Sequence, residues 1–155
     1  MATAETVELG PSHAPHQGSI DAFASILDSV KEELVKLRRD HDKHEPEYFS
    51  AVQHLSDHAL TSFSASDLVA VRVAITAYGL HLFGKVKLRA LEGEGDGYIH
   101  IRVFGQPKEG TDGSTLEERE YSLHSIHTEE VIKGDGDRVY RAVFGKEDEL
   151  EWFDT

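Results

Sequence analysis

Histidine and aspartate cluster near the middle of the chain at spacings that a divalent metal could use. His54 and His58 are four residues apart with Asp57 between them, so a helix would place both imidazoles on one face. Further ligands could come from His41, Asp42 and His44. Two ligands leave a site incomplete, and solvated polar residues on a helix account for the pattern more simply. We therefore expect no metal site and no cofactor.

Motifs of enzymes are also missing from the sequence. The chain has no cysteine, no Gly-Xaa-Ser-Xaa-Gly elbow, no HExxH pair and no phosphate-binding glycine motif. The acidic glycine runs at residues 92–97 and 134–137 lack the ligand spacing of a calcium loop and are typical of turns. These absences favour a binding protein over an enzyme.

Two short segments could instead act as the tips of hairpins. A protein that inserts into the groove of a target needs tips that present apolar and backbone atoms. Tyr78, Gly79 and Leu80 lie where two predicted strands meet, and Gln106 and Pro107 lie after a third. The simpler interpretation is that both segments are ordinary connections between core strands.

The elements that must position these tips begin with a long helix. Apolar residues recur at spacings of three and four from Ser19, a suitable N-cap, to about Arg39. They are Ile20, Phe23, Leu27, Val30, Leu34 and Leu37. We expect Arg38 and Arg39 to complement the dipole at the end of the helix, a charged connector at residues 40–45, and a shorter helix from Pro46 to about Leu60.

The second half of the chain predicts consecutive strands separated by glycine-containing turns. The predicted strands are residues 69–75, 80–91, 98–104, 116–128 and 139–144, with residues 150–153 as a further edge. Residues 1–18 lack periodicity and predict a flexible tail. Residues 19–155 predict a single α+β domain, a long helix and a second shorter helix packed on an antiparallel β-meander.

Two motifs resemble the stefins, the intracellular type-1 cystatins. The first is Tyr98-Ile99-His100-Ile101-Arg102-Val103-Phe104, followed by Gln106-Pro107. The second is the ending Asp148-Glu149-Leu150 with Trp152-Phe153 nearby. The fold that this resemblance implies, one long helix wrapped by an antiparallel sheet, agrees with the organisation inferred from periodicity.

The resemblance also implies an activity, the inhibition of papain-like cysteine peptidases by three segments. These are a flexible N-terminal segment with a glycine, a first hairpin and a second, proline-containing hairpin. The positions that would take these roles are Gly10, Gly18, Tyr78, Gly79, Leu80, Gly105, Gln106 and Pro107.

The sequence departs from the family pattern in three ways. The first-hairpin motif Gln-Xaa-Val-Xaa-Gly is replaced by Ile75-Thr76-Ala77-Tyr78-Gly79, which keeps only the glycine. Gln106 stands where stefins often have leucine, and the chain has additional sequence around residues 40–66 and 129–146. These departures leave two alternatives: a non-inhibitory interaction module with the cystatin fold, or a cone-shaped, nuclear-transport-factor-2-like ligand-binding protein or enzyme.

The composition limits the classes of partner that we expect. The 155 residues include 29 acidic and 16 basic side chains and carry a net charge of −13, which disfavours nucleic acids and anionic membranes as partners. The absence of cysteine excludes disulfides and thiol chemistry and suits a cytoplasmic protein. We expect a protein partner, a papain-like peptidase or another protein, and a monomer or a domain-swapped dimer.

Overall fold

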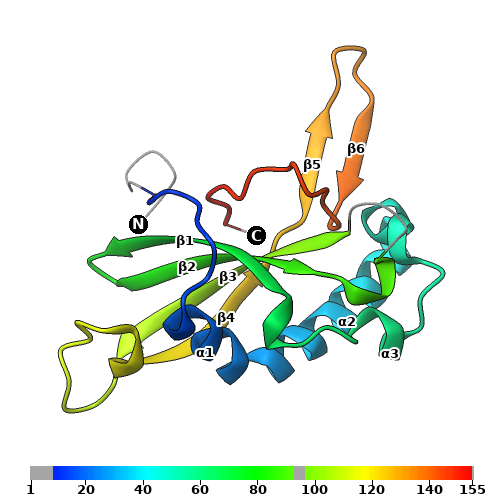
Figure 1. Cartoon of the computed structure of the whole chain (residues 1–155). Helices are drawn as coiled ribbons and strands as arrows, with labels where there is room; N and C mark the ends of the chain where they lie inside the picture. Colours follow the sequence, from blue (N-terminus) through cyan, green and yellow to red (C-terminus); the bar gives the residue numbers. More distant parts are fainter. Residues whose placement is uncertain (1–8, 93–96, 155) are drawn as a thin grey trace.

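The computed structural model describes residues 9–92 and 97–154 and has the expected α+β architecture (Figure 1). Two consecutive helices, α1 (Gln17–Ser25) and α2 (Leu27–His44), pack against one face of a four-stranded antiparallel sheet. The 18 residues of α2 make it the long helix of the fold. Within the described residues, none of the helices has the length and apolar character needed to cross a membrane.

The predicted long helix is present, but it is interrupted at Ile26 and ends later than expected. The Ser25 hydroxyl donates to the Ala22 carbonyl (2.6 Å), and Ile26 leaves helical geometry with φ −117° and ψ 10°. Helix α2 then continues through residues 40–44, so the predicted connector there was wrong. It ends at Glu45 because Pro46 disfavours a helical conformation of the residue before it.

The second helix of the sequence-based prediction is divided into short helical pieces. These are η1 (Pro46–Val52) and α3 (Asp57–Leu60). A further short helical turn, η2 (Ala65–Asp67), follows before the sheet. Arg38 of α2 anchors this region because its guanidinium donates to the carbonyls of Val52 (3.2 Å) and Leu55 (2.7 Å) and pairs with Asp57. Arg38 is buried and lies well before His44, the last residue of α2, so the expectation that it complements the dipole at the end of the helix was wrong.

The main sheet is a meander with strands in the order β1-β2-β3-β4. Its strands are β1 (Leu68–Thr76), β2 (Gly79–Lys87), β3 (Tyr98–Pro107) and β4 (Arg119–Ile126). The short turn η3 (Arg89–Leu91) follows β2, and η4 (Leu116–Glu118) precedes β4. The predicted turn at residues 92–97 falls mostly on residues 93–96, outside the described part. Every neighbouring pair is antiparallel, so the β1–β2 turn and the β3–β4 loop lie at the same end of the sheet.

The helices and the sheet enclose one apolar core. Its large buried side chains include Phe23, Phe49, Phe63, Leu82, Ile101 and Leu34. They occupy the space between the helices and the sheet, where a cone-shaped ligand-binding protein would hold its ligand.

The opposite face of the sheet is covered by the C-terminal segment (residues 145–154). Leu150 and Phe153 pack on Phe83 of β2, with Trp152 beside them. This segment forms no strand, so the predicted edge strand at residues 150–153 was wrong: the segment lies across the face of the sheet.

A small hairpin projects from the body of the protein (Figure 1). It consists of β5 (Glu129–Ile132) and β6 (Arg138–Arg141), with the predicted glycine-rich turn between them, where the Lys133 N–H donates to the Asp137 carbonyl (2.7 Å). The sequence predicted a strand at residues 139–144, and β6 is the shorter strand that forms there.

Candidate functional site

The β1–β2 hairpin turns tightly at the residues expected to form a tip. Thr76 pairs with Gly79, which leaves Ala77 and Tyr78 as the two connecting residues. The Thr76 hydroxyl accepts a hydrogen bond from the Tyr78 N–H (3.1 Å) and donates to the Gly79 carbonyl (3.2 Å). Tyr78 is 63% exposed and the neighbouring Ile75 is 71% exposed, so the hairpin end presents two apolar side chains on a fixed backbone.

Gly79 is required at this turn for two reasons. Its φ of +149° is rarely adopted by L-residues, and an added Cβ would lie 2.7 Å from the Gly105 carbonyl oxygen and 2.8 Å from the Phe104 ring. The hairpin end is therefore packed directly on β3.

We expect Gly79→Ala to lower the free energy of unfolding by about 2 kcal/mol, because the substitution combines backbone strain with a backbone clash. Chemical denaturation measures the change. Gly134→Ala is the matched control, since no heavy atom surrounds that position within 4 Å, and it should leave stability nearly unchanged. Equal stability of the two variants would contradict this account of the turn.

The β3–β4 loop (residues 108–118) forms the second projection at this end. Arg119 holds the loop in place, because its guanidinium donates to the carbonyls of Gly113 (3.0 Å) and Gly105 (2.9 Å). The Lys108 N–H donates to the Glu118 carbonyl (2.7 Å) and closes the base of the loop. The Arg119 side chain and this backbone hydrogen bond therefore hold the loop to the sheet.

The N-terminal segment (residues 9–13) lies beside β1, near the same end of the sheet. The Gly10 N–H donates to the Val73 carbonyl (2.9 Å), and His13 and Val71 exchange hydrogen bonds of 3.0 and 2.9 Å. Because the pairing is antiparallel, Gly10 lies nearer to the hairpin turn than His13 does, and Leu9 packs on the far face of the sheet against the cluster of Phe83, Leu150 and Phe153.

The structure places the predicted contact residues in four different settings. Tyr78 and Gly79 form the exposed hairpin, and Gly10 lies in the N-terminal segment beside β1. Gly18 lies in α1, and Leu80 is 4% exposed and belongs to the core, so neither is at the tip. Gly105, Gln106 and Pro107 are the last paired residues of β3, at the base of the second loop.

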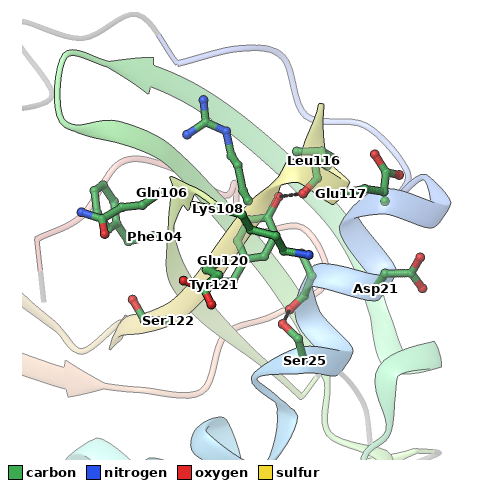
Figure 2. A pocket seen from close by; sticks show the side chains of 13 residues that line it. Asp21, Ser25, Phe104, Gln106, Lys108, Leu116, Glu117, Glu120, Tyr121 and Ser122 are labelled. Carbon is green, nitrogen blue, oxygen red and sulfur yellow. Dashed lines mark hydrogen bonds between the residues drawn. The ribbon is translucent and has the colours of Figure 1, made fainter. Parts of the chain in front are cut away.

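A hollow of about 710 Å³ lies beside the second loop, between α1 and β4 (Figure 2). Gly18, Asp21 and Ser25 of α1 form one wall, and Gln106 and Lys108 lie at the end of β3. Its lining mixes charged, polar and aromatic side chains. Two of the predicted contact residues, Gly18 and Gln106, thus meet here and not at the hairpin turn.

The histidines considered as metal ligands do not converge. Asp57 faces Arg38 and Arg39 in ion pairs, and His58 is exposed in α3. Within the described residues, no group of three or more His, Asp or Glu side chains is arranged to hold a metal ion.

Sequence reasoning missed a row of cations on the far face of the sheet. Arg72 of β1, Lys85 of β2 and Arg102 of β3 all donate to backbone carbonyls of the C-terminal segment, at 2.6 to 2.9 Å. His81, Phe83 and Lys85 occupy alternate positions of β2, on the face away from the helices, and all three are buried. This alternation was the available sign that another part of the chain covers that face. The cations fix the C-terminal segment on the sheet.

Two histidines are buried under this segment. Burial, assisted by the Arg102 charge, lowers the pKa of His81 to about 4. Burial, assisted by Lys85, lowers the pKa of His100 to about 3, and His100 Nε2 makes no hydrogen bond within the described residues. His100 also lines a hollow of about 290 Å³ with His127 and several acidic residues, outside the helix–sheet interior.

Comparison with protein-family models, with curated proteins and with solved structures finds no match for this chain.

Proposed function

We propose that this chain is a stefin-like protein that binds, and inhibits, papain-like cysteine peptidases with the end of its sheet. The observation that carries the proposal is the arrangement of that end. The β1–β2 hairpin and the β3–β4 loop project there together (Figure 1), and Gly10 and His13 of the N-terminal segment pair with β1 beside them. Three adjacent segments are what the resemblance to stefins calls for.

The hairpin is suited to a groove because its shape is fixed before binding. Thr76 holds the turn through two hydrogen bonds, and Gly79 packs against β3, so little conformational entropy is lost on docking. Tyr78 supplies a large apolar surface with few rotatable bonds, a property of residues that dominate interface energies. A tight turn anchored in a sheet also presents its peptide bonds in a shape unlike an extended substrate.

The replaced first-hairpin motif supports a second candidate, a binding module that does not inhibit. Ile75 and Ala77 stand where the motif has Gln and Val, and the exposed side chains at this end are Ile75 and Tyr78. Such a module would contact a peptidase or another protein without blocking a catalytic cleft.

The test titrates papain with the protein and measures hydrolysis of a small substrate. A parallel binding measurement uses papain whose active-site cysteine has been alkylated. We expect inhibition, and we expect Tyr78→Ala to weaken it about tenfold or more because an exposed aromatic anchor is lost. The matched control is Ile132→Ala on the projecting hairpin, where 64% of the side chain is exposed, compared with 63% for Tyr78.

The outcomes separate the candidates. Inhibition that falls with Tyr78→Ala and stays with Ile132→Ala supports the proposal. Binding to alkylated papain without inhibition of the active enzyme supports the non-inhibitory module. Full activity and no binding at about 100 μM protein, a concentration that reveals even weak complexes, overturns both.

A further inference from the structure

The two edge strands of the main sheet, β1 and β4, differ in whether their outer edges are paired. The outer edge of β1 is paired with the N-terminal segment through the hydrogen bonds of Gly10 and His13. The outer edge of β4 pairs with no strand in the part of the chain that the structure describes. An unpaired edge presents backbone donors and acceptors that another extended segment can use.

Alternate residues of β4 direct these groups away from the sheet. The Lys108 N–H donates to the Glu118 carbonyl, and Pro107, which has no N–H, faces Arg119. The alternation of an antiparallel pair then points the backbone groups of Glu120 and Ser122 toward β3. The groups of Tyr121 and Leu123 point outward.

A groove follows this edge between β4 and the helices. The hollow of Figure 2 and a second hollow of about 600 Å³ adjoin, because Ser25, Tyr121 and Ser122 line both. The half-buried side chains of Tyr121 and Leu123 pack on the core below the groove. Strand β4 has eight residues, about 25 Å of extended chain, so the groove has the length of a short peptide strand.

The charges around the groove select the kind of segment that fits. The acidic side chains in the two linings are Asp21, Glu32, Glu33, Glu117 and Glu120. The basic ones are Lys36, Lys108 and Arg119, and the Arg119 guanidinium is already bonded to Gly113 and Gly105. The groove therefore favours a cationic occupant. A second copy of the chain would bring together two such acidic linings and two net charges of −13.

We propose that this groove binds an extended segment of a partner protein that carries lysine or arginine and adds to the sheet as a strand beside β4. Backbone hydrogen bonds to β4 hold the segment, and the acidic side chains of the helices select its charge. The groove shares Gln106, Lys108 and Leu116 with the base of the β3–β4 loop, but its part beside α2, lined by Glu32 and Glu33, contains no residue of the β1–β2 hairpin.

The test uses acetyl-(Lys-Val)4-amide as the probe and amide hydrogen exchange read by NMR as the signal. Strand addition engages the outward N–H groups, so we expect exchange at Tyr121 and Leu123 to slow about tenfold or more at saturating peptide. Exchange at Glu120 and Ser122, which already face β3, should stay unchanged. Acetyl-(Glu-Val)4-amide should produce no protection.

Two charge variants test the acidic wall. We expect Glu32→Lys with Glu33→Lys to weaken peptide binding about tenfold, because the variant repels the cationic segment. Asp135→Lys with Asp137→Lys makes the same change of charge at the turn of the projecting hairpin and should leave binding unchanged. Papain inhibition should be the same in all of these variants, which keeps this proposal distinguishable from the proposed function.

Three results would overturn the inference. The first is no binding at millimolar peptide, and the second is binding without the alternating protection, which would indicate attraction of charge alone. The third is protection of Tyr121 and Leu123 that grows with protein concentration in the absence of peptide, since the occupant would then be another copy of the chain.

Discussion

Replacing Arg102 with alanine is expected to lower the free energy of unfolding by about 4 kcal/mol, the largest loss we expect from a single side chain on the far face of the sheet. Arg102 is 4% exposed. Its guanidinium donates to the Phe153 carbonyl (2.9 Å) and to His81 Nδ1 (3.2 Å). It also lies 4.5 Å from the centre of the Trp152 ring, within the range of a cation–π contact. Truncation removes all of these contacts and leaves two buried acceptors without a donor.

The ion pair with Asp154 contributes little to this expectation. The Asp154 side chain is 71% exposed, so solvent screens its attraction to the guanidinium at 3.2 Å. The loss comes mainly from the buried hydrogen bonds and the ring contact. Arg102→Met, which keeps much of the volume, should therefore recover part of the stability through packing alone.

The measurement combines chemical denaturation with fluorescence of Trp152, the single tryptophan of the chain. Because Trp152 contacts Arg102 directly, we expect its emission to shift in Arg102→Ala before the whole protein unfolds. The control is Arg138→Ala, which removes an exposed ion pair with Glu130 and should cost less than about 0.5 kcal/mol. A loss below about 1 kcal/mol for Arg102→Ala would show that the C-terminal segment is held mainly by other contacts.

The sequence was sufficient for the fold class, because the core-facing patterns are local. Val30 and Leu34 recur at helical spacing, and the residues that pack on the helices alternate along β2 and β3. The break at Ile26 could not be seen in that pattern. The apolar spacing continues across it, and the hydrogen bond from the Ser25 hydroxyl to the Ala22 carbonyl at the break is not encoded in that spacing.

The C-terminal segment was missed because its position depends on distant groups. Lys85 and Arg102 come from two different strands, and they bind backbone carbonyls, which any residue of the segment would supply. No local composition reveals such contacts. The hairpin end was easier to predict, since a glycine between two alternating patterns marks a turn, and Gly79 is the first residue of β2 after the turn at Ala77 and Tyr78.

The groove beside β4 has no sequence signature at all. It follows from which strand is last in the sheet and from how α1 and α2 lie beside it. Its charges are ordinary solvated side chains when the sequence is considered alone. Glu32 and Glu33 both line the groove because α2 lies beside the unpaired edge of β4.

Acidification is expected to destabilise the protein through its two buried histidines. The pKa of His81 falls to about 4 and that of His100 to about 3, in both cases chiefly because burial disfavours the charged imidazole. Lys85, His127 and Arg141 add repulsion around His100, while Asp148 opposes it. The unfolded chain binds protons at these residues near pH 6.5, and the folded protein does not until much lower pH.

Because the unfolded chain binds more protons, the free energy of unfolding decreases as the pH falls. The stabilisation is complete above pH 6.5, is lost as the pH falls from 6.5 toward 4, and levels off below the folded pKa values. With two extra protons bound by the unfolded state, the slope near pH 5 should approach about 2.7 kcal/mol per pH unit. At this slope, the free energy of unfolding lost over two pH units is comparable with the whole stability of a typical domain.

His100→Leu should reduce that slope by about half, because one of the two titrating groups is removed. The same variant should keep most of the stability at pH 7.5, since it replaces a buried imidazole whose Nε2 has no partner among the described residues. Denaturant unfolding from pH 4.5 to 7.5 measures both effects, with the exposed His58→Gln as the control whose slope stays at the original value. Equal slopes for His100→Leu and the unchanged protein would contradict the role of His100. They would assign the acid sensitivity to His81 or to groups on the surface, because replacing a titrating His100 with leucine must change the difference in bound protons between the folded and unfolded states.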